Sequence, residues 1–206
     1  MDVQIYHGAD IAWKDLDACR VQAELWATDP PKLVLENRVA DLARQWKIES
    51  MLDIGCGCGR YYQAIRPQKY IGIDQSIPFF TIANEKYGPD ATFVRARAEE
   101  VILHEQFDLG IMIHVLQHVH DPAGFLLEML QRFNCDRWCF TILTVPGDTR
   151  KIFNINEYEA ALALPVKEAE TVLANLNDLG YSIENFEFQN SVGVEEAREM
   201  LVWTKK

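Results

Sequence analysis

Three alternating glycines follow a short apolar segment, and this spacing favours a ligand-binding turn. Residues 51–54 predict a buried strand, and Gly55, Gly57 and Gly59 come directly after it. Glycine lets the backbone turn tightly and lets a ligand lie against the main chain. The spacing does not fit the G-x-G-x-x-G pattern of dinucleotide-binding turns, and Asp53 suits a ligand with a cationic amino group. Taken alone, the glycines would also fit an ordinary strand-to-helix turn.

A second acid ends the next apolar segment, about 20 residues after the glycine turn. Asp74 directly follows a predicted strand at residues 70–73. A carboxylate at this position can accept hydrogen bonds from both hydroxyls of a ribose, because parallel strands open at their carboxyl ends onto a shared crevice. Asp74 and Ser76 would also serve as the N-cap of the following helix. The two roles are compatible.

Three histidines, His114, His118 and His120, lie close together after a predicted strand at residues 107–113. An unperturbed imidazole titrates near neutrality, which suits a general base. We expect His118 to pack or hydrogen-bond at the start of the next helix and His120 to belong to an exposed turn. His114, at the end of the strand, is the first candidate for a catalytic base, and a role as cavity wall explains it equally well.

The elements that must position these residues predict an α/β fold. From residue 50 onward, short apolar segments alternate with helical stretches, which is typical of a mostly parallel sheet with helices on both faces. The last two strands are separated by about a dozen residues, which favours an antiparallel hairpin. We expect a seven-stranded, Rossmann-like sheet with strand seven antiparallel. The predicted strands cover residues 51–54, 70–73, 92–94, 107–113, 138–145, 182–188 and 200–204, and the predicted helices cover 33–46, 61–65, 78–87, 122–133 and 167–179.

The composition fits one globular domain and disfavours several kinds of partner. The chain has 206 residues, of which 49% are hydrophobic, and its formal charge is −11. No apolar run is long enough to cross a bilayer, and the first residues do not resemble a signal peptide, so we expect a cytoplasmic protein. The acidic balance disfavours nucleic acid and anionic membrane surfaces as partners. The five cysteines lack the spacing of a metal site, and we expect buried thiols and no bound metal.

Four segments, in this order, resemble the class I S-adenosylmethionine-dependent methyltransferase family. Residues 52–59 resemble its glycine-rich first motif, and residues 73–76 resemble the acid after its second strand. Residues 93–99 resemble its adenine-binding turn, and residues 107–122 its fourth strand and the segment that follows. The resemblance covers about residues 39–204. It implies binding of S-adenosyl-L-methionine, release of S-adenosyl-L-homocysteine, and no metal.

The resemblance also implies which residues hold the cofactor. Backbone atoms of the glycine turn would line the methionine and the ribose, and Asp74 would hold the ribose hydroxyls. Gln75 would flank the adenine, and Ala98 would donate its backbone N–H to an adenine nitrogen. Ile113 and His114 would lie under the sulfonium. The implied set is Asp53, Gly55, Cys56, Gly57, Asp74, Gln75, Arg97, Ala98, Glu99, Ile113 and His114.

One position departs from the family pattern. The family often has an aspartate immediately before the position of Ala98, where it accepts from the adenine amino group. This chain has Arg97 there, and a guanidinium can only donate. We therefore expect adenine recognition to depend on backbone groups, on Glu99, or on stacking by Arg97.

The resemblance implies methyl transfer by in-line displacement, and the acidic composition favours a small-molecule acceptor with an oxygen or nitrogen nucleophile. Alignment of the nucleophile with the methyl group and the sulfur is then the main requirement. A general base is needed only for a nucleophile that carries a proton at neutral pH. Two alternatives stay open: a methyltransferase that acts on tRNA or protein, and a module that binds the cofactor or its product without transferring a methyl group.

Two regions outside the resembling core are expected to determine the acceptor. Residues 1–30 predict a helical segment that covers the site, in which Tyr6 and His7 are outlying candidates for the active site. Residues 147–165 predict an insertion that shapes the acceptor pocket, because insertions at the carboxyl ends of strands often carry substrate contacts. Within this insertion, Tyr158 could equally pack onto the sheet.

Overall fold

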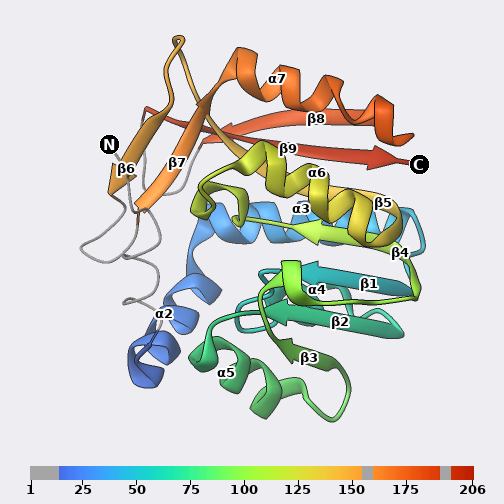
Figure 1. Cartoon of the computed structure of the whole chain (residues 1–206). Coiled ribbons are helices and arrows are strands. Elements are labelled where there is room, and N and C mark those ends of the chain that lie inside the picture. The colour runs from blue at the N-terminus through green and yellow to red at the C-terminus, as the bar shows by residue number, and fades with distance from the viewer. Residues whose placement is uncertain (1–13, 155–159, 191–195) are drawn as a thin grey trace.

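The computed structural model describes residues 14–154, 160–190 and 196–206, and within them one mixed sheet is covered by helices (Figure 1). The strands are β1 Ser50–Ile54, β2 Lys69–Asp74, β3 Thr92–Arg95, β4 Gln106–Met112, β5 Asn134–Val145, β6 Lys151–Asn154, β7 Ala160–Pro165, β8 Ser182–Asn190 and β9 Arg198–Lys205. The helices are α2 Leu16–Thr28, α3 Pro30–Gln45, α4 Arg60–Ile65, α5 Ile77–Tyr87, α6 Pro122–Arg132 and α7 Val166–Ala174, with short 3-10 turns η1 Ala98–Glu100, η2 Leu116–His118 and η3 Asn177–Leu179.

The core of the sheet is parallel. Strands β3, β2, β1, β4 and β5 lie side by side in that order, and each neighbouring pair runs in the same direction. Their carboxyl ends therefore meet at one edge, where the chain leaves each strand in a turn. The α/β, Rossmann-like fold that the sequence predicts is confirmed.

The last two strands form the predicted antiparallel hairpin. Strand β9 pairs with β5 in antiparallel register from Arg137 to Thr144, and β8 pairs with β9 on its other side. Because β9 runs against the parallel strands, its first residues lie at their carboxyl edge. Glu199, opposite Leu143 of β5, is one of these residues.

Nine strands are described, so the prediction of seven is two strands short. The additional pair is the β6–β7 hairpin, which lies within the predicted insertion at residues 147–165, and β7 continues the sheet beside the end of β5. Ala161 and Ala163 of β7 pack against Leu143 and Val145, and Leu162 and Leu164 join the main core cluster. Alanine has low strand propensity, so the alanines weaken the strand signal of this segment.

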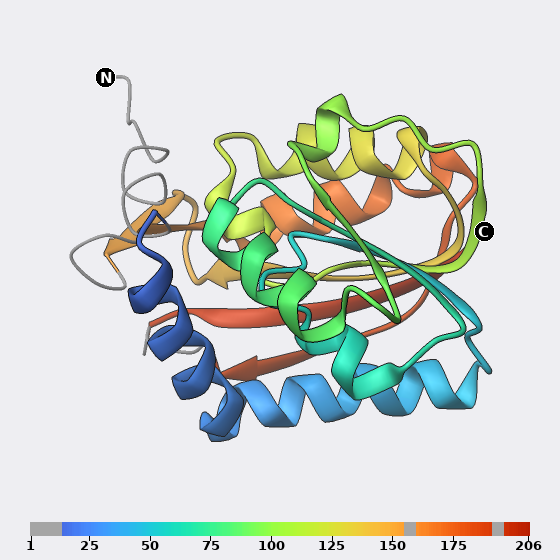
Figure 2. The ribbon, with the colours of Figure 1, turned by 90° about the horizontal axis from the view of Figure 1, so that it is seen from below.

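Helices cover both faces of the sheet (Figure 2). Leu35 of α3 and Tyr62 of α4 pack against one face, and Leu126 of α6 and Val172 of α7 pack against the other. Helix α2 lies beyond the carboxyl ends of the parallel strands (Figures 1 and 2). No helix among the described residues is long and apolar enough to span a membrane. The predicted candidates Tyr6, His7 and Tyr158 lie outside the described residues.

Candidate cofactor and active site

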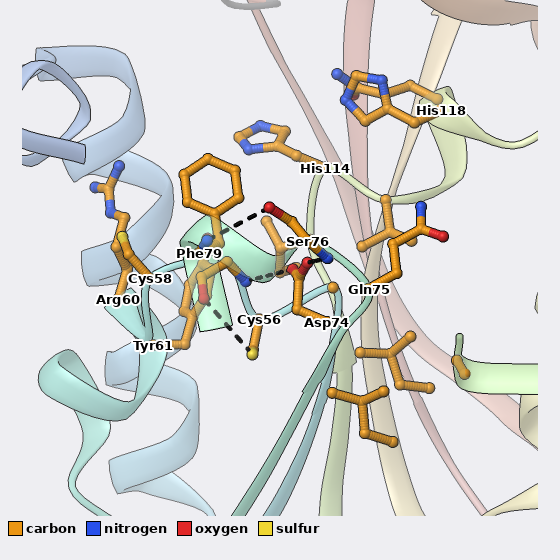
Figure 3. Close-up of a pocket in the computed structure, with 18 of the residues that line it drawn as sticks. Cys56, Cys58, Arg60, Tyr61, Asp74, Gln75, Ser76, Phe79, His114 and His118 are labelled. Atoms are coloured by element: carbon orange, nitrogen blue, oxygen red, sulfur yellow. Dashed lines mark hydrogen bonds between the residues drawn. The ribbon is translucent and has the colours of Figure 1, made fainter. Parts of the chain in front are cut away.

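A cavity of about 620 Å³ opens at the carboxyl edge of the parallel strands (Figure 3). Its volume is typical of small-molecule sites. All the residues that the sequence assigns to the cofactor line this cavity, with the exception of Asp53. The predicted residues in the lining are Gly55, Cys56, Gly57, Asp74, Gln75, Arg97, Ala98, Glu99, Ile113 and His114.

The glycine turn between β1 and α4 requires its glycines. Gly55, Gly57 and Gly59 have φ angles of 71°, 52° and 79°, in the left-handed region that side chains disfavour. A Cβ at Gly55 would lie 2.5 Å from a methyl carbon of Val115, whereas a Cβ at Gly57 would meet no atom within 4 Å. The backbone at Gly57 therefore faces open space in the cavity, where a ligand can approach the main chain.

Asp74 joins the glycine turn to the end of β2. Its Oδ2 accepts the backbone N–H of Gly57 at 2.8 Å, and its Oδ1 accepts that of Ser76 at 2.8 Å (Figure 3). Burial raises the pKa of Asp74, and these two backbone donors partly offset the increase. Ser76 is the N-cap of α5. Each carboxylate oxygen of Asp74 keeps a further lone pair that can accept from a ligand hydroxyl.

Asp53 lies beneath the glycine turn and is 2% exposed. The hydroxyl of Tyr70 donates to its Oδ2 at 2.7 Å. Burial raises the pKa of Asp53 to about 8, an increase that the Tyr70 hydrogen bond opposes and the charge of Asp74 reinforces. The side chain supports the turn from below, and its predicted proximity to a ligand amino group stays a prediction.

The segment after β3 also lines the cavity. Nη2 of Arg97 donates to Oε1 of Glu99 at 2.9 Å, and both residues line the cavity together with Ala98. Arg97, which departs from the family pattern, therefore interacts with the neighbouring carboxylate of Glu99. The two side chains form an ion pair at this part of the cavity.

His114 is fixed at the end of β4 through its backbone and its ring. Its φ angle is 60°, and its N–H donates to Oγ1 of Thr141 on β5 at 2.9 Å. Its ring Nε2 lies 2.8 Å from Oε1 of Glu199 on β9. His118, by contrast, places Nδ1 3.2 Å from the carbonyl oxygen of Ala160 on β7.

Glu199 is 1% exposed, although it is an acid in an apolar strand. Its Oε2 accepts a hydrogen bond from Nε2 of Gln189 on β8 at 2.9 Å. Burial raises the pKa of Glu199, but His114, Gln189 and Thr141 outweigh this effect and hold it below its ordinary value. The carboxylate is therefore ionised at neutral pH.

Comparisons with known proteins agree with this geometry. Residues 52–133 match the model of a family described as a methyltransferase domain. A mitochondrial ubiquinone biosynthesis O-methyltransferase from Candida albicans is 29% identical over 101 residues. That match covers 44% of this chain and spans 31% of the length of the relative.

Solved structures extend the likeness to the whole fold. The N-methyltransferase NodS from Bradyrhizobium japonicum, in complex with S-adenosyl-L-homocysteine, has a TM-score of 0.66 at 14% identity, and 98% of each chain is covered. Magnesium protoporphyrin IX methyltransferase from Synechocystis, with bound cofactor, has a TM-score of 0.61 at 15% identity, covering 85% of this chain and 81% of that one. Residues 52–133 of this chain are therefore similar to a methyltransferase domain, and the whole chain shares the fold of these methyltransferase structures. Its glycine turn lies in the segment matched by the family model.

The cavity also contains residues that sequence reasoning did not select. Tyr61 and Glu199 line it beside His114. Burial raises the pKa of Tyr61 well above its ordinary value, so its hydroxyl donates and does not act as a base. The sequence did contain an indication that Glu199 has a special role, because it is an acid within an apolar strand. Acids are almost never fully buried unless they are paired.

Helix α2 forms one wall of the cavity. Its residues Gln22, Leu25 and Trp26 are part of the lining, and the Trp26 ring packs against Phe79 of α5 with centroids 5.5 Å apart. A buried cluster around Cys19 joins α2 to the glycine turn and to α5. The helix is therefore anchored beside the turn, where it can limit access of water to a bound ligand.

The five cysteines are buried free thiols, as the sequence predicts. Burial raises the pKa of Cys56 well above its ordinary value and that of Cys139 to about 12. Within the described part of the chain, no three His, Cys, Asp or Glu side chains are grouped so that they could hold a metal ion. Cys56 and Cys58 belong to the cavity as parts of the glycine turn.

Replacing Gly57 with alanine should weaken cofactor binding more than it weakens the fold. The left-handed φ costs a side chain about 1–2 kcal/mol, and the new methyl group would occupy space at the main chain. We expect affinity for S-adenosyl-L-homocysteine, measured by titration calorimetry, to fall about tenfold or more. Gly55→Ala is the comparison, because its Cβ meets Val115 and should lower the melting temperature further. Wild-type affinity of Gly57→Ala would contradict the role given to this position.

The raised pKa of Asp53 predicts a pH effect on stability. The folded chain holds this proton up to about pH 8, whereas the ordinary value is 3.8. The contribution of Asp53 to the free energy of unfolding is therefore fully present below about pH 4. It is lost as the pH rises to 8 and the buried carboxyl group loses its proton. Asp53→Asn should remove this loss, so the variant gains stability relative to wild type between pH 5 and pH 9 in urea unfolding. The exposed Asp178→Asn should show no such gain, and equal differences for both variants would exclude the proposed cause.

Proposed function

We propose that this chain transfers the methyl group of S-adenosyl-L-methionine to a small-molecule acceptor by in-line displacement at an oxygen or nitrogen nucleophile. One observation carries the proposal. A single cavity joins the glycine turn and Asp74, which suit the cofactor, to the paired imidazole of His114, which suits proton transfer. The O-methyltransferase and the N-methyltransferase among the similar proteins act on acceptors of both kinds by name.

The residues present fit this cofactor. The open space at Gly57 accepts a ligand against the main chain, and the lone pairs of Asp74 suit ribose hydroxyls. Gln75, Ala98 and Glu99 would hold the adenine. When bound, S-adenosyl-L-methionine supplies a methyl group on a sulfonium, whose leaving group is a neutral thioether. The chain then has to orient the acceptor and to exclude water.

Charge and shape support a small acceptor. The chain carries a formal charge of −11, which opposes binding of a phosphate backbone, and α2 closes one side of the cavity. We propose that α2, as part of the segment at residues 1–30, covers the site. We further propose that residues 147–165 shape the acceptor end, that the enzyme is cytoplasmic, and that it needs no metal. Unchanged activity in the presence of EDTA is expected.

The test is incubation of the chain with methyl-labelled S-adenosyl-L-methionine and a cell extract that is separated into small molecules, RNA and protein. Label in the small-molecule fraction supports the proposal. Label in RNA or protein would replace it with the macromolecular alternative. Tight cofactor binding with no label in any fraction would indicate a binding module. The same incubation with heat-denatured chain serves as the control.

A further inference from the structure

Glu199 is a buried carboxylate at the cavity that cofactor binding does not explain. It lies on the strand that runs against the parallel core, and this reversal places it at the carboxyl edge beside His114. Glu199 also faces Gln189 directly in the β8–β9 register, and Gln189 donates to its second oxygen. Two neighbouring strands thus hold one acid against the imidazole.

This contact determines which nitrogen of His114 is basic. Nε2 lies 2.8 Å from Oε1 of Glu199, a buried oxygen that no other group satisfies, although the contact does not have hydrogen-bond geometry. A carboxylate oxygen has only lone pairs to offer, so its charge favours the neutral ring with its proton on Nε2, and Nδ1 keeps the free lone pair. Among the residues that the structure describes, none forms a hydrogen bond with Nδ1. The backbone bond to Thr141 fixes the other end of the residue. The ring is therefore held at two points with one basic atom available.

We propose that Glu199, supported by Gln189, is a positioning residue that holds His114 as a general base with Nδ1 available to the acceptor, and that the acceptor group is a hydroxyl. The inference rests on the proposed methyl transfer. A hydroxyl must lose its proton as its oxygen attacks, whereas a carboxylate or a thioether has none to lose, and a neutral amine attacks through its lone pair and loses its proton afterwards. A base held against the acceptor therefore accelerates the transfer most for a hydroxyl.

Apart from the methyl donor and the acceptor, the proposed step uses only His114 and Glu199. The bond between the acceptor oxygen and the methyl carbon forms as the carbon–sulfur bond breaks, and the electron pair of that bond stays on sulfur. The hydroxyl proton moves to Nδ1 of His114. The ring becomes an imidazolium that faces the Glu199 carboxylate at 2.8 Å, so the new charge is stabilised as it appears.

The other titratable groups in the cavity fit this role less well. Tyr61 stays protonated because burial raises its pKa. Asp74 already accepts two backbone N–H groups, and the Nδ1 of His118 contacts Ala160.

The experiment compares Glu199→Gln with Glu196→Gln, an exposed acid in the same stretch that pairs with Lys151. Nitrogen-15 NMR of labelled histidine, in the full chain without cofactor at alkaline pH, reads the tautomer of His114 directly. We expect the Nε2–H form in wild type and in Glu196→Gln, and a mixture of tautomers in Glu199→Gln. An unchanged tautomer in Glu199→Gln would overturn the positioning role.

Activity tests the acceptor with carbon-13 methyl cofactor and the small-molecule extract. Glu199→Gln should lower kcat about 10- to 100-fold, less than the full contribution of a base, with S-adenosyl-L-homocysteine affinity unchanged and partial rescue in Glu199→Asp. The chemical shift of the transferred methyl carbon should identify an O-methyl product. An N-, S- or C-methyl product would overturn the hydroxyl acceptor while leaving methyl transfer intact. Absence of any labelled product from wild type would instead refute the proposed function, and the hydroxyl acceptor with it.

Discussion

Replacing His114 with asparagine is expected to lower the rate of methyl transfer about 100-fold or more, because a general base contributes about 10²–10⁴-fold. Cofactor affinity should stay close to that of wild type, since the ribose and adenine ends of the cavity are untouched. Both quantities are measurable on one preparation, by labelled-methyl transfer and by calorimetric titration with S-adenosyl-L-homocysteine. A loss of rate without a loss of affinity separates a base from a cofactor ligand.

Asparagine is chosen because of the backbone at this position. The φ of His114 is 60°, and asparagine visits the left-handed region far more readily than alanine does. His114→Asn also keeps the N–H that donates to Thr141, so the loop should remain in place. The exposed His120→Asn provides the same chemical change two residues beyond the end of η2 and should leave the rate unchanged. Full activity of His114→Asn would leave His114 as a wall of the cavity only.

The parallel core and the grouping of the glycine turn with Asp74 at one cavity were predictable because their signals are local. Buried parallel strands read as short, continuous apolar runs, as at residues 107–113, and the glycine turn and Asp74 each follow such a run directly. Since the carboxyl ends of parallel strands share one edge, predicting the strands was enough to bring these residues together.

The partner of His114 was not predictable in this way. Glu199 reaches the site only because β9 is antiparallel and pairs with β5 in one register, with Glu199 opposite Leu143. Register depends on how two strands pack against each other, and neither strand sequence specifies its partner. The same limit applies to the β6–β7 hairpin, whose alanines pack well against β5 but carry little strand propensity of their own.

Asp74→Asn is expected to lower affinity for S-adenosyl-L-homocysteine about 100-fold. Hydrogen bonds to a charged group contribute about 1.5–3 kcal/mol each, and two of them correspond to about two factors of ten. The exposed Asp90→Asn is the matched control. Because burial raises the pKa of Asp74, wild-type affinity should also fall as the pH is lowered and this carboxylate takes up a proton. The variant should lose that dependence.

The loss of affinity in Asp74→Asn could have two causes, and a modified ligand can distinguish them. The carboxylate of Asp74 could bind the ribose directly, or it could act only by holding Gly57 and Ser76 in place. If it binds the ribose, an analogue without the 2′ and 3′ hydroxyls should bind wild type weakly and should lose little further affinity in Asp74→Asn. If it only holds the turn, the variant should weaken both ligands by the same factor. Equal losses would therefore remove the ribose contact from the site while leaving Asp74 as the anchor of the glycine turn.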